Sequence, residues 1–368
     1  MFIKYLLKFK KIPKIVVAYI EDKIKSCKIK LSQRYFLMTH YSKGIKKLIV
    51  FLTQGKDIVS GGILSISSIY EESIKIKNIH KAEVIMCTSP GEPPLLKYTK
   101  FENHNYIYGF AQILSHFTNL QNLIVYIPET YVETFLNNIP QKLFNIKQRH
   151  FNIMNQNGEY FPSMTCIERL KKLGKVTCTA CYERDATVEI RNKLGVPIHK
   201  LLYYVSSEQY FRKKYNEKDD LMVVSPDPHL KKEEVLRTIA TKFPQLKITI
   251  IQDLTYQDYK KLISRAKWSL TFGEGLDGYF AETIFSGGIG FSVYNPIFFT
   301  DDFKHLRTVY ENYNALLEKI CLDMKQLDTA TDYASYQQEQ YNICCKHFSY
   351  EQYVENLKLF YKEEYTYK

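Results

Sequence analysis

The sequence lacks the features that would place its start in a membrane or tie the protein to a metal. Within residues 1–50 the uncharged runs, such as Ile15 to Ile20, fall far short of the roughly 20 residues that cross a bilayer. A secretory apolar segment followed by a small-residue cleavage site is also missing there. No Asp-x-Asp motif of the metal-binding kind occurs in the chain. We therefore expect no spanning segment or cleaved signal in this region, and no metal or other cofactor.

The cysteines do not have the arrangement of a small disulfide-rich protein. There are eight in 368 residues, and a chain of this length buries enough core without covalent cross-links. Cys178 and Cys181 are spaced like half of a zinc site, but no second pair follows at zinc-ribbon spacing. They lie in the run Val176 to Cys181, which has the pattern of a buried strand. We expect free thiols and hence a reducing cytosol.

Charge is concentrated at the start of the chain. The formal net charge is +12, and residues 1–50 hold 13 basic side chains against Glu21 and Asp22, a net of +11. Basic and apolar residues interleave through residues 1–45, which predicts a basic amphipathic extension suited to an anionic membrane surface. A solvated helical extension is the alternative. Nucleic acid would use the same charge, but no recognition motif accompanies it, so we expect no nucleic acid partner.

The rest of the chain alternates short apolar runs with segments of helical spacing. This alternation predicts an α/β fold in which open parallel sheets carry helices on both faces. The polar stretch Tyr215 to Asp220 divides two such units, one over residues 46–215 and one over residues 216–345. From Leu306 onward only helices are predicted. The predicted strands are 46–52, 82–87, 123–127, 150–154, 176–181 and 199–205 in the first unit, and 221–224, 247–251, 268–272 and 289–293 in the second.

One loop of the second unit concentrates glycine and carboxylate residues. It reads Gly273-Glu274-Gly275-Leu276-Asp277-Gly278, with Glu282 about one turn into the next helix. Glycine permits positive φ and a close approach of the backbone to a ligand. The free N–H groups at the helix start suit a diphosphate, and the two glutamates suit sugar hydroxyls, since a carboxylate accepts two hydrogen bonds. A capped helix after a glycine-rich turn would explain the glycines but not both glutamates.

The spacing of Glu274 and Glu282, an E-x7-E pattern that continues to Gly287 and Gly288, resembles the signature of retaining GT-B glycosyltransferases. The resemblance is specific over residues 267–295 and extends to the two-unit layout. More narrowly, the chain is similar to glycosyltransferases of bacterial capsule and O-antigen clusters. The resemblance implies two doubly wound, Rossmann-like domains that face a cleft, the first binding the acceptor and the second the nucleotide-sugar. It also implies that a last helix, within residues 346–368, packs back on the first domain.

The resemblance assigns roles within the loop. Glu274 would be the catalytic residue that approaches the donor-sugar hydroxyls near the reacting carbon, and Glu282 would hold the ribose of the nucleotide. Gly273 and Gly275 would contact the sugar and the diphosphate through their backbones. We count the rest of the loop among the donor contacts: Leu276, Asp277 and Gly278.

Two further regions are implied by the same resemblance. Gly61-Gly62 follows the first predicted strand, where the family places a glycine pair near the diphosphate and acceptor, although a simple turn would use two glycines as well. The family's basic pair normally follows the first strand of the second domain, and the stretch Val224 to Lys232 lacks the usual Arg. Lysines solvated at a helix start are the alternative to a diphosphate contact. We include Ser225 in the site and expect the positive charge from one of four residues: His229, Lys231, Lys232 or Arg265.

The resemblance implies transfer of a hexose from a nucleotide diphosphate-sugar to a lipid-linked or growing surface polysaccharide, with retention and without a metal. Many relatives carry a His on a late loop of the first domain, but Thr177 to Arg184 has none, so Tyr182, Glu183 or Arg184 is expected to face the cleft. The basic extension would hold a cytoplasmic enzyme against the inner face of the membrane. The alternatives are a sugar-binding assembly protein without activity and a nucleotide-sugar epimerase.

Overall fold

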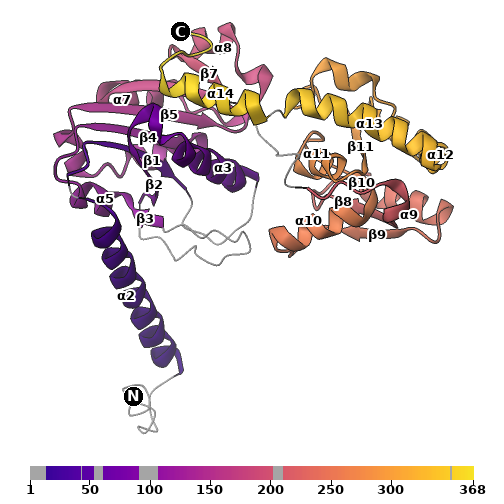
Figure 1. Ribbon diagram of the computed structural model, residues 1–368, viewed down its shortest axis with the longest axis horizontal. Helices are drawn as coiled ribbons and strands as arrows, with labels where there is room; N and C mark the ends of the chain where they lie inside the picture. The colour runs from indigo at the N-terminus through magenta and orange to yellow at the C-terminus, as the bar shows by residue number, and fades with distance from the viewer. Residues whose placement is uncertain (1–13, 43, 54–60, 91–106, 202–209, 349) are drawn as a thin grey trace.

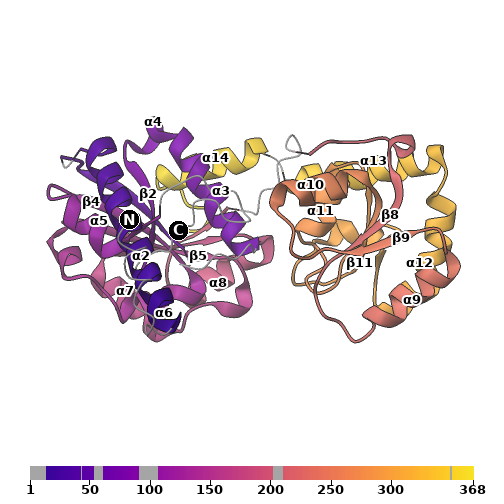
Figure 2. The same ribbon diagram turned by 90° about the horizontal axis from the view of Figure 1, so that it is seen from below.

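The computed structural model describes residues 14–42, 44–53, 61–90, 107–201, 210–348 and 350–368. The predicted fold class is confirmed, because two α/β domains, each built on a parallel sheet with helices on both faces, lie next to each other (Figures 1 and 2). Residues 1–13 of the basic extension, part of the loop before Gly61 and most of the predicted strand 199–205 lie outside the described residues.

The first domain contains a seven-stranded sheet in which all neighbouring strands run parallel. The order β3-β2-β1-β4-β5-β6-β7 places β1 inside the sheet. Its residues after Lys47 are buried on both faces, which explains the continuous apolar run. The strands are β1 (Lys47–Leu52), β2 (Glu83–Thr88), β3 (Ile107–Gly109), β4 (Asn122–Pro128), β5 (Gln148–Asn155), β6 (Lys175–Ala180) and β7 (Ile198–Lys200).

Helices cover both faces of this sheet. Alternate residues of β1 point to opposite faces, so Leu48 and Val50 pack with one group of helices and Ile49 and Phe51 with another. The first group is α5 (Phe110–His116), α6 (Val132–Leu136), α7 (Met164–Leu173) and α8 (Val188–Leu194). The second group is α3 (Gly61–Lys75), α4 (Lys77–His80) and α14 (Tyr350–Tyr361).

The second domain contains a five-stranded parallel sheet in the order β12-β11-β10-β8-β9. Trp268 on β10 is the only tryptophan of the chain and is 2% exposed. The strands are β8 (Asp219–Val224), β9 (Lys247–Ile250), β10 (Ala266–Leu270), β11 (Ile289–Val293) and β12 (Val309–Tyr310). The helices are α9 (Lys232–Lys242), α10 (Tyr256–Arg265), α11 (Gly278–Phe285), α12 (Tyr313–Leu327) and α13 (Ala330–His347).

Strand β12 corrects the prediction that only helices follow Leu306. Val309 and Tyr310 pair in parallel with Ser292 and Val293 at the edge of the sheet. Two residues are too short a run for their spacing to distinguish a strand from the start of a helix.

Helix α2 (Lys14–His40) extends away from the first domain (Figure 1). Near its end Leu37 is 2% exposed and belongs to the core of the first domain, with Phe36 packed beside it. Among the side chains of this helix that the structure describes, the exposed large apolar ones are Val16, Tyr19, Ile24, Leu31, Tyr35 and Met38. No helix in the described part of the chain is long and apolar enough to cross a membrane.

Helix α14 follows the second domain in sequence but packs on the first (Figures 1 and 2). Tyr353, Leu357 and Phe360 are buried in the same cluster as Ile49. Beyond the helix, the backbone of Tyr367 exchanges two hydrogen bonds of 2.9 Å with Ile198 of β7. The chain therefore crosses between the domains twice.

Candidate functional site

The loop between β10 and α11 has a shape that only glycine permits at two positions. Gly273 and Gly275 have φ values of 77° and 85°, in the left-handed region that side chains disfavour. A Cβ on Gly275 would lie 2.7 Å from a ring carbon of Phe299 and 2.9 Å from the Ser292 hydroxyl. The Thr271 hydroxyl donates to the carbonyl of Gly275 at 2.9 Å and holds the turn. The loop is thus tightly packed against the carboxyl ends of β10 and β11.

Two of the predicted loop residues are engaged by the fold itself. Asp277 is the N-cap of α11, and its carboxylate accepts a hydrogen bond from the N–H of Phe280 at 2.9 Å. Burial raises the pKa of Asp277 well above its ordinary value, although this hydrogen bond opposes the change. Leu276 is 7% exposed and belongs to the apolar core. Their side chains fix the loop, which leaves Glu274 and the backbone near Gly278 to meet a ligand.

Glu274 lies on the exposed side of the loop and contacts the first domain. The Tyr182 hydroxyl, just beyond β6, donates to its Oε2 at 3.3 Å. The ring of Tyr182 also packs edge-on against Phe298 with 5.1 Å between ring centroids. Desolvation raises the pKa of Glu274, while the hydrogen bond from Tyr182 lowers it. These contacts join the carboxyl ends of the two sheets.

Of the three residues expected to replace the family's His, Tyr182 is the one that reaches the glycine loop. Glu183 instead pairs with Lys200, and Arg184 lies 3.9 Å from the Asp185 carboxylate within its own domain. The sequence left these three open because nothing local shows which side chain points across to the other domain.

Glu282 is 3% exposed, one turn into α11, and its Oε2 has no hydrogen-bond partner among the described residues. Burial raises its pKa from the ordinary 4.5 to about 7, and the nearby Tyr259 and Tyr210 side chains oppose the rise. A buried acceptor without a donor costs about 1–3 kcal/mol. The Oε2 of Glu282, which makes no hydrogen bond with the described residues, can therefore accept one from the hydroxyl of a ligand.

The basic candidates lie in different places. The Nζ of Lys232 donates to the carbonyls of Ser225 at 2.6 Å and Asp227 at 2.9 Å, at the carboxyl end of β8. The Ser225 hydroxyl accepts a hydrogen bond from the N–H of Phe272, next to the glycine loop. Lys231 is half-exposed and pairs with Glu234 at 2.8 Å. Of the two lysines, Lys232 is therefore the one anchored at the loop.

The prediction that Arg265 belongs to the site is wrong. The Arg265 guanidinium pairs with Asp219, the first residue of β8, at 2.5 Å. The glycine loop lies at the other end of these parallel strands, so Arg265 is on the wrong edge of the sheet. Arg265 is the last residue of α10, and helices of a doubly wound sheet end at the amino edge of the following strand, whereas ligands bind at the carboxyl edge.

Two aromatic rings that the sequence did not single out, those of Tyr313 and Phe272, lie beside the same loop together with the candidate His229. The ring of His229 stacks on Tyr313 with 3.6 Å between centroids, and Tyr313 stacks on Phe272 at 5.9 Å. Tyr313 also hydrogen-bonds the backbone of Gly273. Tyr313 opens α12, 40 positions after Gly273, and no local pattern connects the two.

The first domain contributes a glycine and a buried carboxyl at the same edge. Gln156 donates to the carbonyl of Gly62 at 2.8 Å, and a Cβ on Gly62 would lie 2.7 Å from its Oε1, whereas Gly61 has open space. Glu129, just after β4, is 5% exposed, and its Oε2 has no partner in the described part of the chain. Burial raises the pKa of Glu129 to about 7, against backbone hydrogen bonds that include those of Gln156 and Asn157.

Among the described residues, no group of three or more His, Cys, Asp or Glu side chains is placed so that it could hold a metal ion. Cys178 and Cys181 are buried and free, and burial raises the pKa of Cys181 to about 12. Cys178 packs in the core of the first domain, and Cys181, just beyond β6, lies 3.9 Å from the Ser65 hydroxyl of α3.

Two parallel α/β domains whose carboxyl edges meet at a glycine loop define the GT-B fold, which the solved structures share. Sucrose-phosphate synthase from Thermosynechococcus elongatus superposes with a TM-score of 0.54 at 8% identity, over 87% of this chain and 99% of that chain. HepE from Anabaena, in complex with UDP-glucose, gives 0.54 at 10% identity, over 86% and 98%. The Escherichia coli trehalose-6-phosphate structure bound with UDP-2-fluoro glucose gives 0.51 at 10%, over 85% and 99%. Neither a protein-family model nor a curated protein matches the sequence.

Proposed function

We propose that this chain is a glycosyltransferase that moves a hexose from a nucleotide diphosphate-sugar to an acceptor. The observation that carries the proposal is the buried Glu282 carboxyl, whose Oε2 lacks a hydrogen-bond partner among the described residues. It stands one turn inside α11, next to the glycine loop. A ribose hydroxyl would supply the missing donor. The fold is shared with structures that hold UDP-glucose and UDP-2-fluoro glucose, which supports a donor of this kind.

Each group then has a task in the transfer. Glu274 accepts hydrogen bonds from donor-sugar hydroxyls, and Tyr182 keeps its carboxylate oriented. The diphosphate lies at the start of α11, where free N–H groups favour negative charge. Lys232 exchanges its two carbonyl partners for the diphosphate oxygens and stabilises the charge that develops as the nucleotide leaves.

The bond changes follow from a leaving diphosphate. The bond between the anomeric carbon and the diphosphate oxygen breaks, and the nucleoside diphosphate leaves with the electron pair. The acceptor hydroxyl forms the new bond from the same face and gives its proton to the departing phosphate oxygen, so the configuration is retained. Glu129 stands at the matching edge of the first domain, where its unpaired Oε2 suits an acceptor hydroxyl.

The acceptor we propose is lipid-linked or a growing surface polysaccharide such as capsule, O-antigen or exopolysaccharide. Support comes from α2, which projects from the first domain and exposes Leu31 and Tyr35 at 62% and 72%. Residues 1–50 carry a net charge of +11. Apolar side chains flanked by basic ones suit the inner, anionic surface of a bacterial cytoplasmic membrane, where such an acceptor is held.

A donor panel tests the proposal. Purified protein is incubated with UDP-, GDP- and dTDP-linked hexoses, and nucleoside diphosphate release is measured with and without acceptor. We expect release from one donor and a fall of about 100-fold in Glu274→Gln, as for loss of one transition-state contact. The exposed Glu318 on α12 provides the control Glu318→Gln, which should keep the parent rate.

Two outcomes would replace the proposal by its rivals. Thermal stabilisation by a nucleotide-sugar with no release from any donor indicates a sugar-binding protein without activity. Conversion of one nucleotide-sugar into its epimer, without free nucleotide, indicates an epimerase. A Glu274→Gln variant with the parent rate contradicts the catalytic role of that residue.

A further inference from the structure

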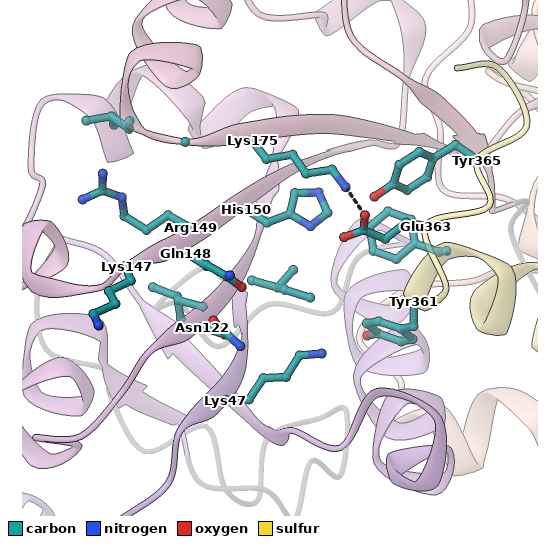
Figure 3. Close-up of a pocket in the computed structure, with 15 residues that line it drawn as sticks. Lys47, Asn122, Lys147, Gln148, Arg149, His150, Lys175, Tyr361, Glu363 and Tyr365 are labelled. Atoms are coloured by element: carbon teal, nitrogen blue, oxygen red, sulfur yellow. Dashed lines mark ion pairs between the residues drawn. The ribbon is translucent and has the colours of Figure 1, made fainter.

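A cavity lies at the edge of the first domain away from the glycine pair. Its volume is about 400 Å³, and small-molecule sites measure roughly 300–1,000 Å³. The floor is formed by the first residues of the neighbouring strands β1, β4, β5 and β6. One wall is the end of α14 with the chain that follows it, including Tyr361, Glu363 and Tyr365 (Figure 3). The cavity and the Glu274–Glu282 loop share no residue.

The strand register lines up three polar side chains on this floor. Lys47 is the partner of Asn122 in the parallel ladder, and Asn122 is the partner of Gln148. Residues paired in a parallel ladder point to the same face of the sheet. Further along the strands, the same face packs Ile49 and other apolar residues beneath α3 and α14. None of the three polar side chains makes a hydrogen bond or ion pair within the described part of the chain.

The lining carries four basic side chains and one acidic one. Lys175 pairs with Glu363 at 2.7 Å (Figure 3). Lys47 and Lys175 reach the cavity, while Lys147 and Arg149 extend from the other side of the floor and add positive potential. The Nε of Arg149 is buried without a hydrogen-bond partner among the described residues. The cavity therefore attracts a negatively charged ligand.

The remaining lining suits a ligand with hydroxyl groups. The Nε2 of His150 shares a 2.7 Å hydrogen bond with the Thr177 hydroxyl, and the ring is 8% exposed. Burial, together with the nearby Lys175, lowers the pKa of His150 to about 3, so the ring is neutral and adds no charge. The amides of Asn122 and Gln148 both donate and accept, as alternating hydroxyls require.

We propose that this cavity binds a small hydroxylated anion, a sugar phosphate or a sugar acid. The anionic group lies between Lys47 and Lys175, and hydroxyls lie over Asn122 and Gln148. In the free protein the Glu363 carboxylate forms an ion pair with the Lys175 ammonium, and the anionic group of the ligand replaces that carboxylate. Tyr365 closes the wall beside Lys175, 5.0 Å from the ammonium to the ring centroid. This site is separate from the transferase site and does not depend on the function proposed above.

Calorimetric titration of the full chain tests the proposal. Glucose 6-phosphate, glucuronate, glucose and inorganic phosphate are compared, and we expect one of the first two to bind at least about tenfold more tightly than glucose or phosphate. Lys47→Ala should weaken that binding about tenfold, since it removes one charge-assisted contact. Lys193→Ala changes an exposed lysine of α8 that has no ion pair among the described residues, and should leave binding unchanged.

A loss of binding in Lys47→Ala could come from a folding defect, so a second variant that should bind more tightly is needed. Glu363→Gln releases Lys175 from its ion pair, and we expect the same ligand to bind more tightly, by up to about tenfold. Failure of both sugar anions to bind, equal affinity for inorganic phosphate, parent-like binding by Lys47→Ala, or no gain in Glu363→Gln would each overturn the proposal. Equal loss in Lys193→Ala would place the ligand elsewhere.

Discussion

The buried carboxyl of Glu282 should make the stability of the second domain depend on pH, and Glu282→Gln should remove that dependence. Burial raises the pKa of Glu282 from 4.5 to about 7. Between these values the native state keeps a proton that the unfolded chain has lost, so the free energy of unfolding falls as pH rises. The fall is about 1.4 kcal/mol per pH unit, or roughly 3 kcal/mol over the interval. The stabilisation is complete below pH 4.5 and lost above about pH 7.

Trp268 provides the assay, because the only tryptophan is buried in the same domain as Glu282. Urea unfolding is followed by tryptophan fluorescence at pH values between 4.5 and 7 for the parent and the Gln variant. We expect the free energies of the two to diverge along this interval by roughly 3 kcal/mol. Glu318→Gln, on the exposed side of α12, should run parallel to the parent. The buried Glu129 titrates in the first domain, where this fluorescence does not report.

A constant difference between the parent and Glu282→Gln across the interval would refute this reasoning. The carboxyl would then be ionised throughout in the native state, and the Tyr259 and Tyr210 hydroxyls would satisfy it without a ligand. If the reasoning holds, a bound nucleoside diphosphate should stabilise the parent more at pH 7 than at pH 4.5, because ribose hydroxyls favour the ionised carboxylate.

Three further predictions follow from the structure. Gly275→Ala places a Cβ 2.7 Å from an aromatic ring at a φ of 85°, and should lower the free energy of unfolding by about 2–4 kcal/mol in the tryptophan assay; an unchanged urea midpoint would contradict it. Tyr182→Phe removes the hydrogen bond to Glu274 and should slow donor turnover about tenfold, whereas an unchanged rate would leave Tyr182 without a role in the site. Leu31→Gln combined with Tyr35→Gln should release the protein from phosphatidylglycerol vesicles in a sedimentation assay, and undiminished sedimentation would rule out α2 as the membrane contact.

The sheets could be predicted because their pattern is local. The run that became β1 is apolar over five consecutive residues, Leu48 to Leu52, since a central parallel strand is covered on both faces. The association of Glu274 and Glu282 with one site could be predicted for the same reason, because both lie in one short segment, a loop and the first turn of the next helix. By contrast, β12 is held by its partner β11 and not by its own sequence.

The residues that contact the glycine loop could not be predicted from the sequence, because they come from segments distant along the chain. Tyr182 meets Glu274 across 92 positions and between two domains, and no periodicity encodes that approach. Lys231 and Lys232 are neighbours at the start of α9 and so point in different directions. The Lys232 ammonium lies at the end of β8, and the Lys231 ammonium pairs with Glu234. The extension was predicted as a surface element, yet the burial of Leu37 in the first-domain core needed the tertiary structure.

The position of α14 has a consequence for synthesis on the ribosome. Residues 350–361 emerge after the whole second domain, but they cover the face of the first sheet that contains Ile49 and Phe51. Until then that apolar face, with Tyr126 stacked on Phe51 at 4.2 Å, stays without part of its cover. The nascent first domain therefore exposes part of this apolar face until α14 is made. A chain truncated before residue 350 would keep that surface exposed, and hence prone to aggregation, even with the second domain folded.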